Sequence, residues 1–149
     1  MRLEEEIRQE KFRNENQKLA VNIIFTHGWL SDHQSKFFGK FDITGTQYNI
    51  LRILRGQYPN PVSINVLKER MLDKMCDASR LVERLRKKGW VEREICEEDR
   101  RRANVRITKS GLLLLQKMDE YNEAFDNILS NLSASETKQL NHLLDKLRG

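Results

Sequence analysis

The chain has 149 residues, of which 38% are hydrophobic and 33% are charged, and it carries a net charge of +5. Its length suits a single domain, 1–149, with a hydrophobic core of its own, and its composition is typical of a soluble, helix-rich protein. Residues 1–6 lack the apolar core of a signal peptide and no apolar run approaches the roughly 20 residues of a membrane span, so we expect a cytoplasmic protein without membrane contacts.

The first part of the chain is predicted to be helical. Apolar residues recur from about residue 3 to residue 38 without a proline, which indicates one long helix or two helices joined near Gly28. Thr44 and Gln47 have the spacing of a capping box, in which each side chain accepts from the backbone N–H of the other residue. A new helix is therefore expected to open at Thr44 and to end before the Pro-Asn-Pro run at residues 59–61.

Two further helices are predicted over residues 63–71 and 74–88, with a tight turn between them. In the second helix Ala78, Leu81, Val82 and Leu85 recur at i, i+3, i+4 and i+7, which makes one apolar stripe and predicts the buried face. A helix whose other face carries basic side chains can lie in the major groove of DNA, although an ordinary amphipathic surface helix has the same pattern. The residues expected opposite or near the edge of the stripe are Lys74, Cys76, Asp77, Arg80, Arg84 and Lys87.

Three consecutive arginines, Arg100, Arg101 and Arg102, lie between two short segments that are predicted to pair as strands. The guanidinium groups repel one another, and their shape fits phosphate oxygens and the narrow minor groove of DNA, although a solvated loop is equally compatible with the triplet. Residues 63–109 hold 14 Lys and Arg against 9 Asp and Glu, which accounts for the whole net charge of +5. This segment is therefore predicted to attract a polyanion.

The last part of the chain is again predicted to be helical. A long apolar stripe follows Gly111, and Ser133 and Glu136 form a second capping box that opens a final helix. These terminal helices have more apolar surface than the small central unit needs. Association with a second copy would cover that surface, and the alternative is a monomer whose terminal helices fold back on the centre.

The arginine-rich helix and hairpin resemble the signature of the multiple-antibiotic-resistance regulator (MarR) family. The resemblance extends over nearly all of the chain. It implies a mainly α fold with a small β wing, namely a winged helix-turn-helix at about 44–111 with dimerisation helices at about 1–40 and 112–149. The residues that carry the resemblance are the run 80–93, Asp99, Arg100, Arg101, Val105, Ile107, Thr108 and Gly111.

The resemblance also implies roles for individual residues. The helix at 74–88 would enter the major groove of double-stranded DNA and an arginine of the wing would enter the minor groove, with Asp99 bracing the wing by pairing with Arg101. Which arginine enters the groove stays open, and Arg80 is the residue that we expect to contact a base or phosphate. The predicted DNA-binding residues are Lys74, Cys76, Asp77, Arg80, Arg84, Arg100, Arg101 and Arg102.

Members of the family often respond to a small aromatic or anionic effector, and some respond to oxidation of a cysteine. His27, Trp29 and Tyr48 are the predicted effector-binding residues, although aromatic residues on helices are more often plain core. Cys76 is the redox candidate, because the start of a helix and the nearby Lys74 would lower its thiol pKa while Asp73 and Asp77 would oppose this. The oxidation-sensing branches have their reactive cysteine near the amino-terminal end, where this chain has none.

The predicted function is a homodimeric repressor, or less often an activator, that binds a palindromic operator and is released by a small ligand or a stress signal. The alternatives are a protein-interaction module that binds an acidic partner and a redox-responsive regulator acting through Cys76. No metal or cofactor is expected, because Cys76, Cys96 and three scattered histidines show no zinc-ligand spacing. No nucleophile-elbow, phosphate-loop or zinc-protease motif is present, so no enzyme is predicted and no catalytic residue is assigned.

Overall fold

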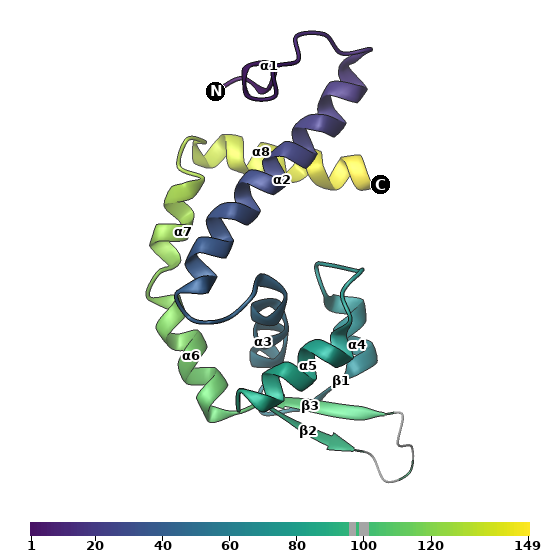
Figure 1. The fold of residues 1–149 in the computed structure, drawn as a ribbon, viewed down its shortest axis with the longest axis vertical. Helices are drawn as coiled ribbons and strands as arrows, with labels where there is room; N and C mark the ends of the chain where they lie inside the picture. The colour runs from purple at the N-terminus through teal and green to yellow at the C-terminus, as the bar shows by residue number, and fades with distance from the viewer. Residues whose placement is uncertain (96–97, 99–101) are drawn as a thin grey trace.

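The computed structural model describes residues 1–95, 98 and 102–149, which form a long molecule with helices at one end and a β-hairpin at the other (Figure 1). In chain order the elements of this part are α1 (Leu3–Glu6), α2 (Glu15–Gly39), α3 (Gly45–Gln57), β1 (Val62–Ser63), α4 (Ile64–Arg70), α5 (Ala78–Lys87), β2 (Val91–Ile95), β3 (Ala103–Ile107), α6 (Lys109–Asp119), α7 (Asn122–Ile128) and α8 (Ala134–Arg148).

Both predicted capping boxes are confirmed. The Thr44 hydroxyl accepts from the backbone N–H of Gln47 at 3.2 Å, and the Gln47 side chain accepts from the backbone N–H of Thr44 at 3.1 Å, so that α3 opens here. Ser133 and Glu136 make the same reciprocal bonds at the start of α8. Each box satisfies backbone donors that the first helical turn leaves without a partner.

The amino-terminal helices differ from the prediction. The chain does not break near Gly28, which lies in the middle of the continuous helix α2. The break falls between α1 and α2, and α2 begins where the Asn14 side chain accepts from the backbone N–H of Gln17 at 2.9 Å. An exposed glycine inside a long helix costs about 1 kcal/mol relative to alanine, which the other residues of such a helix can offset.

A three-stranded antiparallel sheet in the order β1-β3-β2 confirms the predicted hairpin. The register of β2 on β3 pairs Val91 with Ile107 and Arg93 with Val105. Along β3 the residues Ala103, Val105 and Ile107 are buried while those between them are half-exposed, so one face of the strand packs on the helices. The short strand β1, which was not predicted, pairs Val62 with Val105 and joins the helices to the hairpin.

The hydrophobic core lies between α3, α4, α5, α6 and the sheet. Gly111 allows the start of α6 to approach the sheet, because a Cβ atom there would lie 2.4 Å from the carbonyl oxygen of Trp90 and 2.7 Å from the Ile107 side chain. The largest fully buried side chains are Ile50, Leu51, Leu54, Leu67, Met71, Leu85, Ile107, Leu115, Met118, Val82 and Val105.

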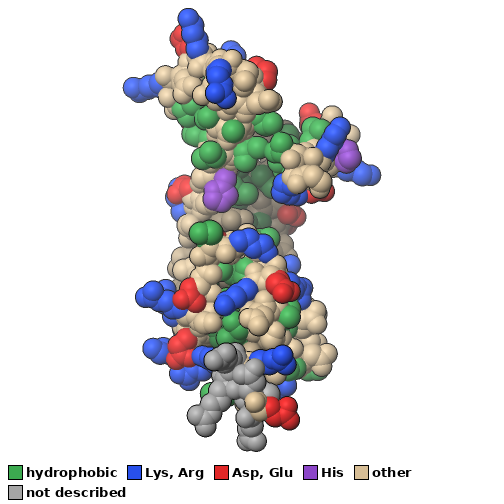
Figure 2. Space-filling model, turned by 90° about the vertical axis from the view of Figure 1, so that its right-hand side faces the viewer, with side chains coloured by type: hydrophobic (Ala, Val, Ile, Leu, Met, Phe, Trp, Pro, Cys, Tyr) green, Lys and Arg blue, Asp and Glu red, His purple; other side chains and the backbone are tan. Residues whose placement is uncertain are grey.

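The terminal helices leave most of their apolar side chains outside this core. Among the described residues of α2 only Phe38 is buried, and none is buried in α7 or α8. Figure 2 shows hydrophobic side chains gathered over the upper end of the molecule, where α1, α2 and α8 lie. No helix among the described residues is long and apolar enough to cross a membrane.

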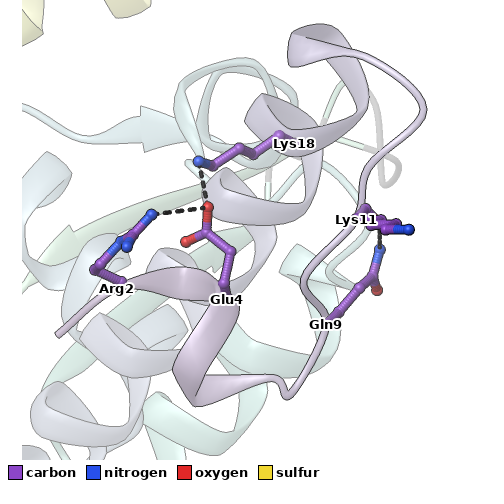
Figure 3. Close-up of polar contacts among 5 residues, drawn as sticks. All are labelled: Arg2, Glu4, Gln9, Lys11 and Lys18. Atoms are coloured by element: carbon purple, nitrogen blue, oxygen red, sulfur yellow. Dashed lines mark hydrogen bonds and ion pairs between the residues drawn. The ribbon is translucent and has the colours of Figure 1, made fainter.

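Helix α1 is held against α2 by charge and by one apolar side chain. The Lys18 ammonium group donates to the Glu4 carboxylate, and the Arg2 guanidinium lies 3.8 Å from the same carboxylate oxygen (Figure 3). The hydrogen bond from Lys18 is the main reason that the pKa of the Glu4 carboxyl lies below its ordinary value. Leu3 is buried beside this contact, so the short helix is attached rather than loose.

Candidate nucleic-acid interface

Helix α5 separates apolar from basic side chains as predicted. Ala78, Val82 and Leu85 are fully buried against the core and Leu81, the fourth residue of the predicted stripe, is only half-buried, whereas Arg80 and Arg84 are exposed. The two arginines are one turn apart, so both guanidinium groups lie along the same outer face of the helix. Helix α5 is therefore anchored by its apolar stripe and offers cations to the solvent.

The start of α5 differs from the prediction. The helix begins at Ala78 and not at Lys74, because the Asp77 side chain accepts from the backbone N–H of Arg80 at 3.1 Å and caps the helix there. The Asp73 side chain accepts from the backbone N–H of Met75 at 2.9 Å, which holds the preceding residues in a turn. Lys74 and Cys76 therefore lie in this turn, and the Asp77 carboxylate is engaged in the cap.

The remaining acidic residue of α5 is engaged as well. The Glu83 carboxylate accepts two hydrogen bonds from the Arg86 guanidinium, at 2.8 and 2.9 Å. These bonds are the main cause of the lowered pKa of the Glu83 carboxyl and of the raised pKa of Arg86. Within the described part of the chain Arg80 and Arg84 form no ion pair, so their charge is available to another molecule.

A shallow hollow of about 240 Å³ lies between the turn and the outer face of α5. The side chains of Arg80 and Arg84 line it together with residues of the turn, so the turn and the two guanidinium groups face the same side of the molecule. The lining residues are Thr46, Asp73, Cys76, Asp77, Arg80, Leu81 and Arg84.

Cys76 is half-buried at this hollow, and its thiol donates to the backbone carbonyl of Asp73 at 3.0 Å. The prediction of a lowered thiol pKa is wrong. Burial is the largest cause and raises the pKa of Cys76, the charge of Asp73 raises it further, and the opposing effect of Lys74 is smaller. A raised pKa leaves less thiolate at neutral pH, and the thiolate is the reactive form.

The hairpin β2–β3 lies beside α5 and extends beyond it (Figure 1). Of the predicted wing residues, Arg102 is exposed just before β3, whereas Asp99, Arg100 and Arg101 lie outside the described residues. Arg93 was not among the predicted site residues. It is exposed on β2 and close enough to Glu83 of α5 to lower the pKa of that carboxyl, so it adds a positive charge between helix and hairpin.

The predicted effector-binding residues do not converge on one site in this chain. His27 is exposed on α2, and Trp29 is half-buried with its ring centroid 4.7 Å from that of His33. The Tyr48 ring of α3 packs instead on Phe38 of α2, with the two ring centroids 4.8 Å apart. Phe38 follows Trp29 by nine residues, so the two residues lie ~13 Å apart along the axis of α2. Trp29 and Tyr48 therefore belong to separate aromatic contacts.

Comparison with known proteins identifies the family. Residues 41–102 match the model described as MarR family. The HTH-type transcriptional regulator PecS of Dickeya dadantii is 30% identical over 148 residues, which cover 93% of this chain and 89% of PecS. The chain belongs to the MarR family. The family member IacR of Pseudomonas putida, an HTH-type transcriptional repressor, is 26% identical over 120 residues that cover 80% of this chain and 71% of IacR.

The fold agrees with this MarR membership. A mutant MarR from E. coli, solved in complex with operator DNA, superposes with a TM-score of 0.79 at 25% identity and covers 93% of this chain and 99% of that one. The predicted winged helix-turn-helix, mainly α with a small β wing, is thereby confirmed. Because MarR family members are transcription regulators, this chain is a DNA-binding transcription regulator and not an enzyme.

Proposed function

We propose that this MarR protein is a homodimeric repressor that binds a palindromic operator and leaves it when a small effector binds. One observation carries the proposal. Helix α5 buries Ala78, Val82 and Leu85 completely and aims Arg80 and Arg84 outward, without an ion pair to either arginine from the described residues. A rigid helix with free guanidinium groups on its outer face fits the major groove.

In the proposed complex α5 is the recognition helix. Arg80 lies in its first turn, the end of a recognition helix that contacts base edges, and Arg84 follows one turn later toward the phosphates. Lys74 and Cys76 of the preceding turn lie at the rim of the groove. Asp77 acts on DNA indirectly, because its carboxylate caps the helix that carries Arg80.

The hairpin is the proposed wing. Its register pairs Val91 with Ile107 and Ile95 with Ala103, and the exposed Arg102 immediately precedes β3. By the family resemblance one arginine of the triplet, Arg100, Arg101 or Arg102, enters the minor groove. Asp99 braces the wing in the same proposal, and a narrow minor groove favours the arginine because its negative potential is enhanced.

The dimer is proposed from the uncovered apolar side chains of the terminal helices. Ile24 of α2 is 71% exposed and Leu143 of α8 is 51% exposed, and leucines on both helices are exposed beside them. A second copy would cover this surface through a twofold interface. The same twofold axis would place two copies of α5 one DNA turn apart, about 34–36 Å, which matches a palindromic operator.

The effector proposal rests on an aromatic and a cationic group that lie side by side. The Arg52 guanidinium donates to the Tyr48 hydroxyl at 3.2 Å and lies 5.8 Å from the centre of its ring, and Arg52 is exposed. An aromatic carboxylate would find a ring to stack on and a cation to pair with at Tyr48. His27 and Trp29 of the proposed effector set reach such a ligand only if the second copy brings its own α2 to the site.

The deciding experiment is a fluorescence anisotropy titration of the protein against duplex from the upstream region of its own gene and against a scrambled duplex, at two salt concentrations. A sequence-specific regulator will bind the upstream duplex about a thousandfold more tightly at physiological salt. Benzoate, as a probe of the effector proposal, is expected to weaken this binding and to leave the weak binding to scrambled duplex unchanged. Equal, salt-sensitive binding to both duplexes would contradict the proposal and favour a generic polyanion or acidic-partner site.

A further inference from the structure

Two large apolar side chains stand out from the turn that precedes α5. Met75 is 93% exposed and Leu72 is 86% exposed, and apart from Met1 no large hydrophobic side chain among the described residues is more exposed. Single exposed leucines are ordinary on a protein surface. Here, however, two such side chains lie three residues apart in the turn that leads into the proposed recognition helix.

The turn itself is well anchored. Met71 is buried in the core, and the backbone N–H of Leu72 donates to the Asn49 side chain of α3 at 2.9 Å. The carboxylate of Asp73 holds the backbone N–H of Met75, and the thiol of Cys76 donates to the carbonyl of Asp73. The side chains of Leu72 and Met75 therefore project from a fixed backbone, and binding need not order a loose loop before it gains apolar contact.

The charges around the turn indicate what would cover these side chains. Asp73, Cys76 and Asp77 of the turn line one hollow with Arg80 and Arg84. Met75 lies outside this lining, between Cys76 and Lys74 in the chain, and the Lys74 ammonium donates to the backbone carbonyl of Glu69. Both carboxylates of the turn, Asp73 and Asp77, accept backbone hydrogen bonds. Exposed apolar side chains in a turn that is next to cations without an ion pair among the described residues are complementary to a polyanion that also presents apolar groups.

The major groove of DNA has this chemistry, because phosphates border it and each thymine places a C5 methyl group in it. We propose that Met75, with Leu72 beside it, packs against thymine methyl groups at the edge of the operator half-site and so selects thymine there. The inference rests on the proposed function and names the base that this end of the recognition surface selects. Methionine suits the task because its unbranched thioether adapts to an apolar contact, whereas it offers little to the polar edges of the other bases.

The test removes only the methyl group. The upstream duplex that the protein selects is prepared with thymine and with uracil at the thymines of each half-site, and both duplexes are titrated by anisotropy. Wild-type protein is expected to bind the thymine duplex about fourfold more tightly for each contacted methyl, the effect of one buried methyl group. Met75→Gln is expected to bind both duplexes equally, and Met75→Leu, which stays apolar, is expected to restore the preference for thymine.

Comparing the thymine-to-uracil ratio between wild type and Met75→Gln removes any effect of the methyl on the duplex itself. Thermal melting should be unchanged in both variants, because the side chain is exposed in the wild type. Selection of the upstream duplex over the scrambled one with equal binding of thymine and uracil would overturn this inference and leave the proposed function standing. Failure of the wild type to select the upstream duplex would overturn both.

Two further outcomes would also overturn the inference. If Met75→Gln and Leu72→Gln both keep the full preference for thymine, the methyl groups are contacted elsewhere on the protein. If Met75→Gln instead shifts the sedimentation coefficient toward a smaller species, the side chain belongs to an interface between copies of the chain.

Discussion

The central unit and the terminal helices of this protein differ in how far their apolar side chains are buried. In the central unit α3, α4, α5, α6 and the sheet bury one another, and Leu67 and Leu85 are fully inaccessible to solvent. In the terminal helices Ile24 and Leu143 are largely exposed although the same helical spacing of apolar residues occurs there. Apolar periodicity thus shows which face of a helix will be covered, but not whether the covering surface belongs to the same chain.

The two regions meet at an aromatic cluster around Phe38 of α2, which is buried in the core. Its ring centroid lies 4.8 Å from that of Tyr48 of α3 and 6.0 Å from that of Phe125 of α7. The central unit is thereby attached to the terminal helices, so any change that an effector causes in one region has a physical route to the other.

The largest effect is expected from a cavity in the central unit. Leu85→Ala removes a fully buried side chain that fixes α5 on the core and is expected to lower the free energy of unfolding by about 2–5 kcal/mol. Urea unfolding followed by circular dichroism measures this change. The matched control is Leu113→Ala on α6, where the side chain is 59% exposed and the loss should stay within about 0.5 kcal/mol. An equal decrease in the free energy of unfolding for the two variants would contradict the difference in burial between the two side chains.

The next effect concerns the open surface of the terminal helices. Placing a carboxylate in the proposed interface with Leu143→Glu is expected to weaken the dimer about a hundredfold, because the charge would lose its water on association. Sedimentation velocity over a concentration series measures this, and circular dichroism should show that the helices remain. Val66→Glu is the control, because Val66 of α4 is exposed and lies outside both predicted dimerisation segments. If the wild-type chain sediments as a monomer at every concentration, the proposed dimer is wrong.

The elements that the sequence predicted correctly depend on neighbouring residues. The boxes at Thr44 and Ser133 need only a partner three residues on, and the apolar stripe of α5 is a property of a single helix. The β-hairpin was also predicted, from two short segments on either side of a polar run. Such features survive folding because tertiary packing reinforces them and does not replace them.

The incorrect predictions involve competition between local signals or burial. Asp73 and Asp77 can each cap a helix, and the structure uses Asp77, so α5 starts four residues later than predicted. Of the two arrangements predicted for the amino-terminal part, one long helix or two joined near Gly28, the break near Gly28 is wrong, because Gly28 lies inside the long helix α2. The pKa of Cys76 depends on how deeply the core covers the thiol, which spacing along the chain does not reveal. The DNA contacts of the wing arginines and the effector-binding residues stay predictions.

Arg80 and Arg86 of α5 can be compared directly, because Arg86 pairs with Glu83 whereas Arg80 forms no ion pair with the described residues. Arg80→Ala is expected to cost about 1–3 kcal/mol in operator binding if the guanidinium reads a guanine, and to relax the preference at one base pair. Arg86→Ala is the control, because Arg86 already donates twice to Glu83. Anisotropy titrations with single-base operator variants measure both. A loss for Arg80→Ala that is the same for every sequence would assign Arg80 to a phosphate.

A smaller effect is expected at the ion pair between α3 and α6, inside the central unit. Arg55 and Asp119 are each about one-third exposed, so solvent screens the pair, and its two-pronged geometry should be worth about 0.5–1 kcal/mol. A double-mutant cycle with Arg55→Met and Asp119→Asn, measured by urea unfolding, isolates this coupling. The exposed pair of Lys36 and Asp32 within α2 is the control and should couple more weakly. Equal coupling would mean that the pair between α3 and α6 is no stronger than an ordinary exposed pair.

The smallest effect tests the chemistry of Cys76. In a Cys96→Ser background the remaining thiol should react with iodoacetamide more slowly in the folded protein than in urea at pH 7 to 8, because burial and Asp73 raise the pKa of Cys76 and reduce the thiolate fraction. The folded-state rate should then rise as the pH approaches that raised pKa.

Asp73→Asn keeps an acceptor oxygen for the backbone N–H of Met75 and removes the charge, so it should speed the reaction of Cys76 at neutral pH. Asp145→Asn on α8 is the matched control and should have no effect, because Asp145 pairs with Arg148 on its own helix. A folded-state reaction faster than that of the unfolded chain would show a thiol activated by its surroundings. The regulator would then have a redox-sensitive group beside Arg80 and Arg84 of α5, and oxidation of Cys76 would become the signal to test first.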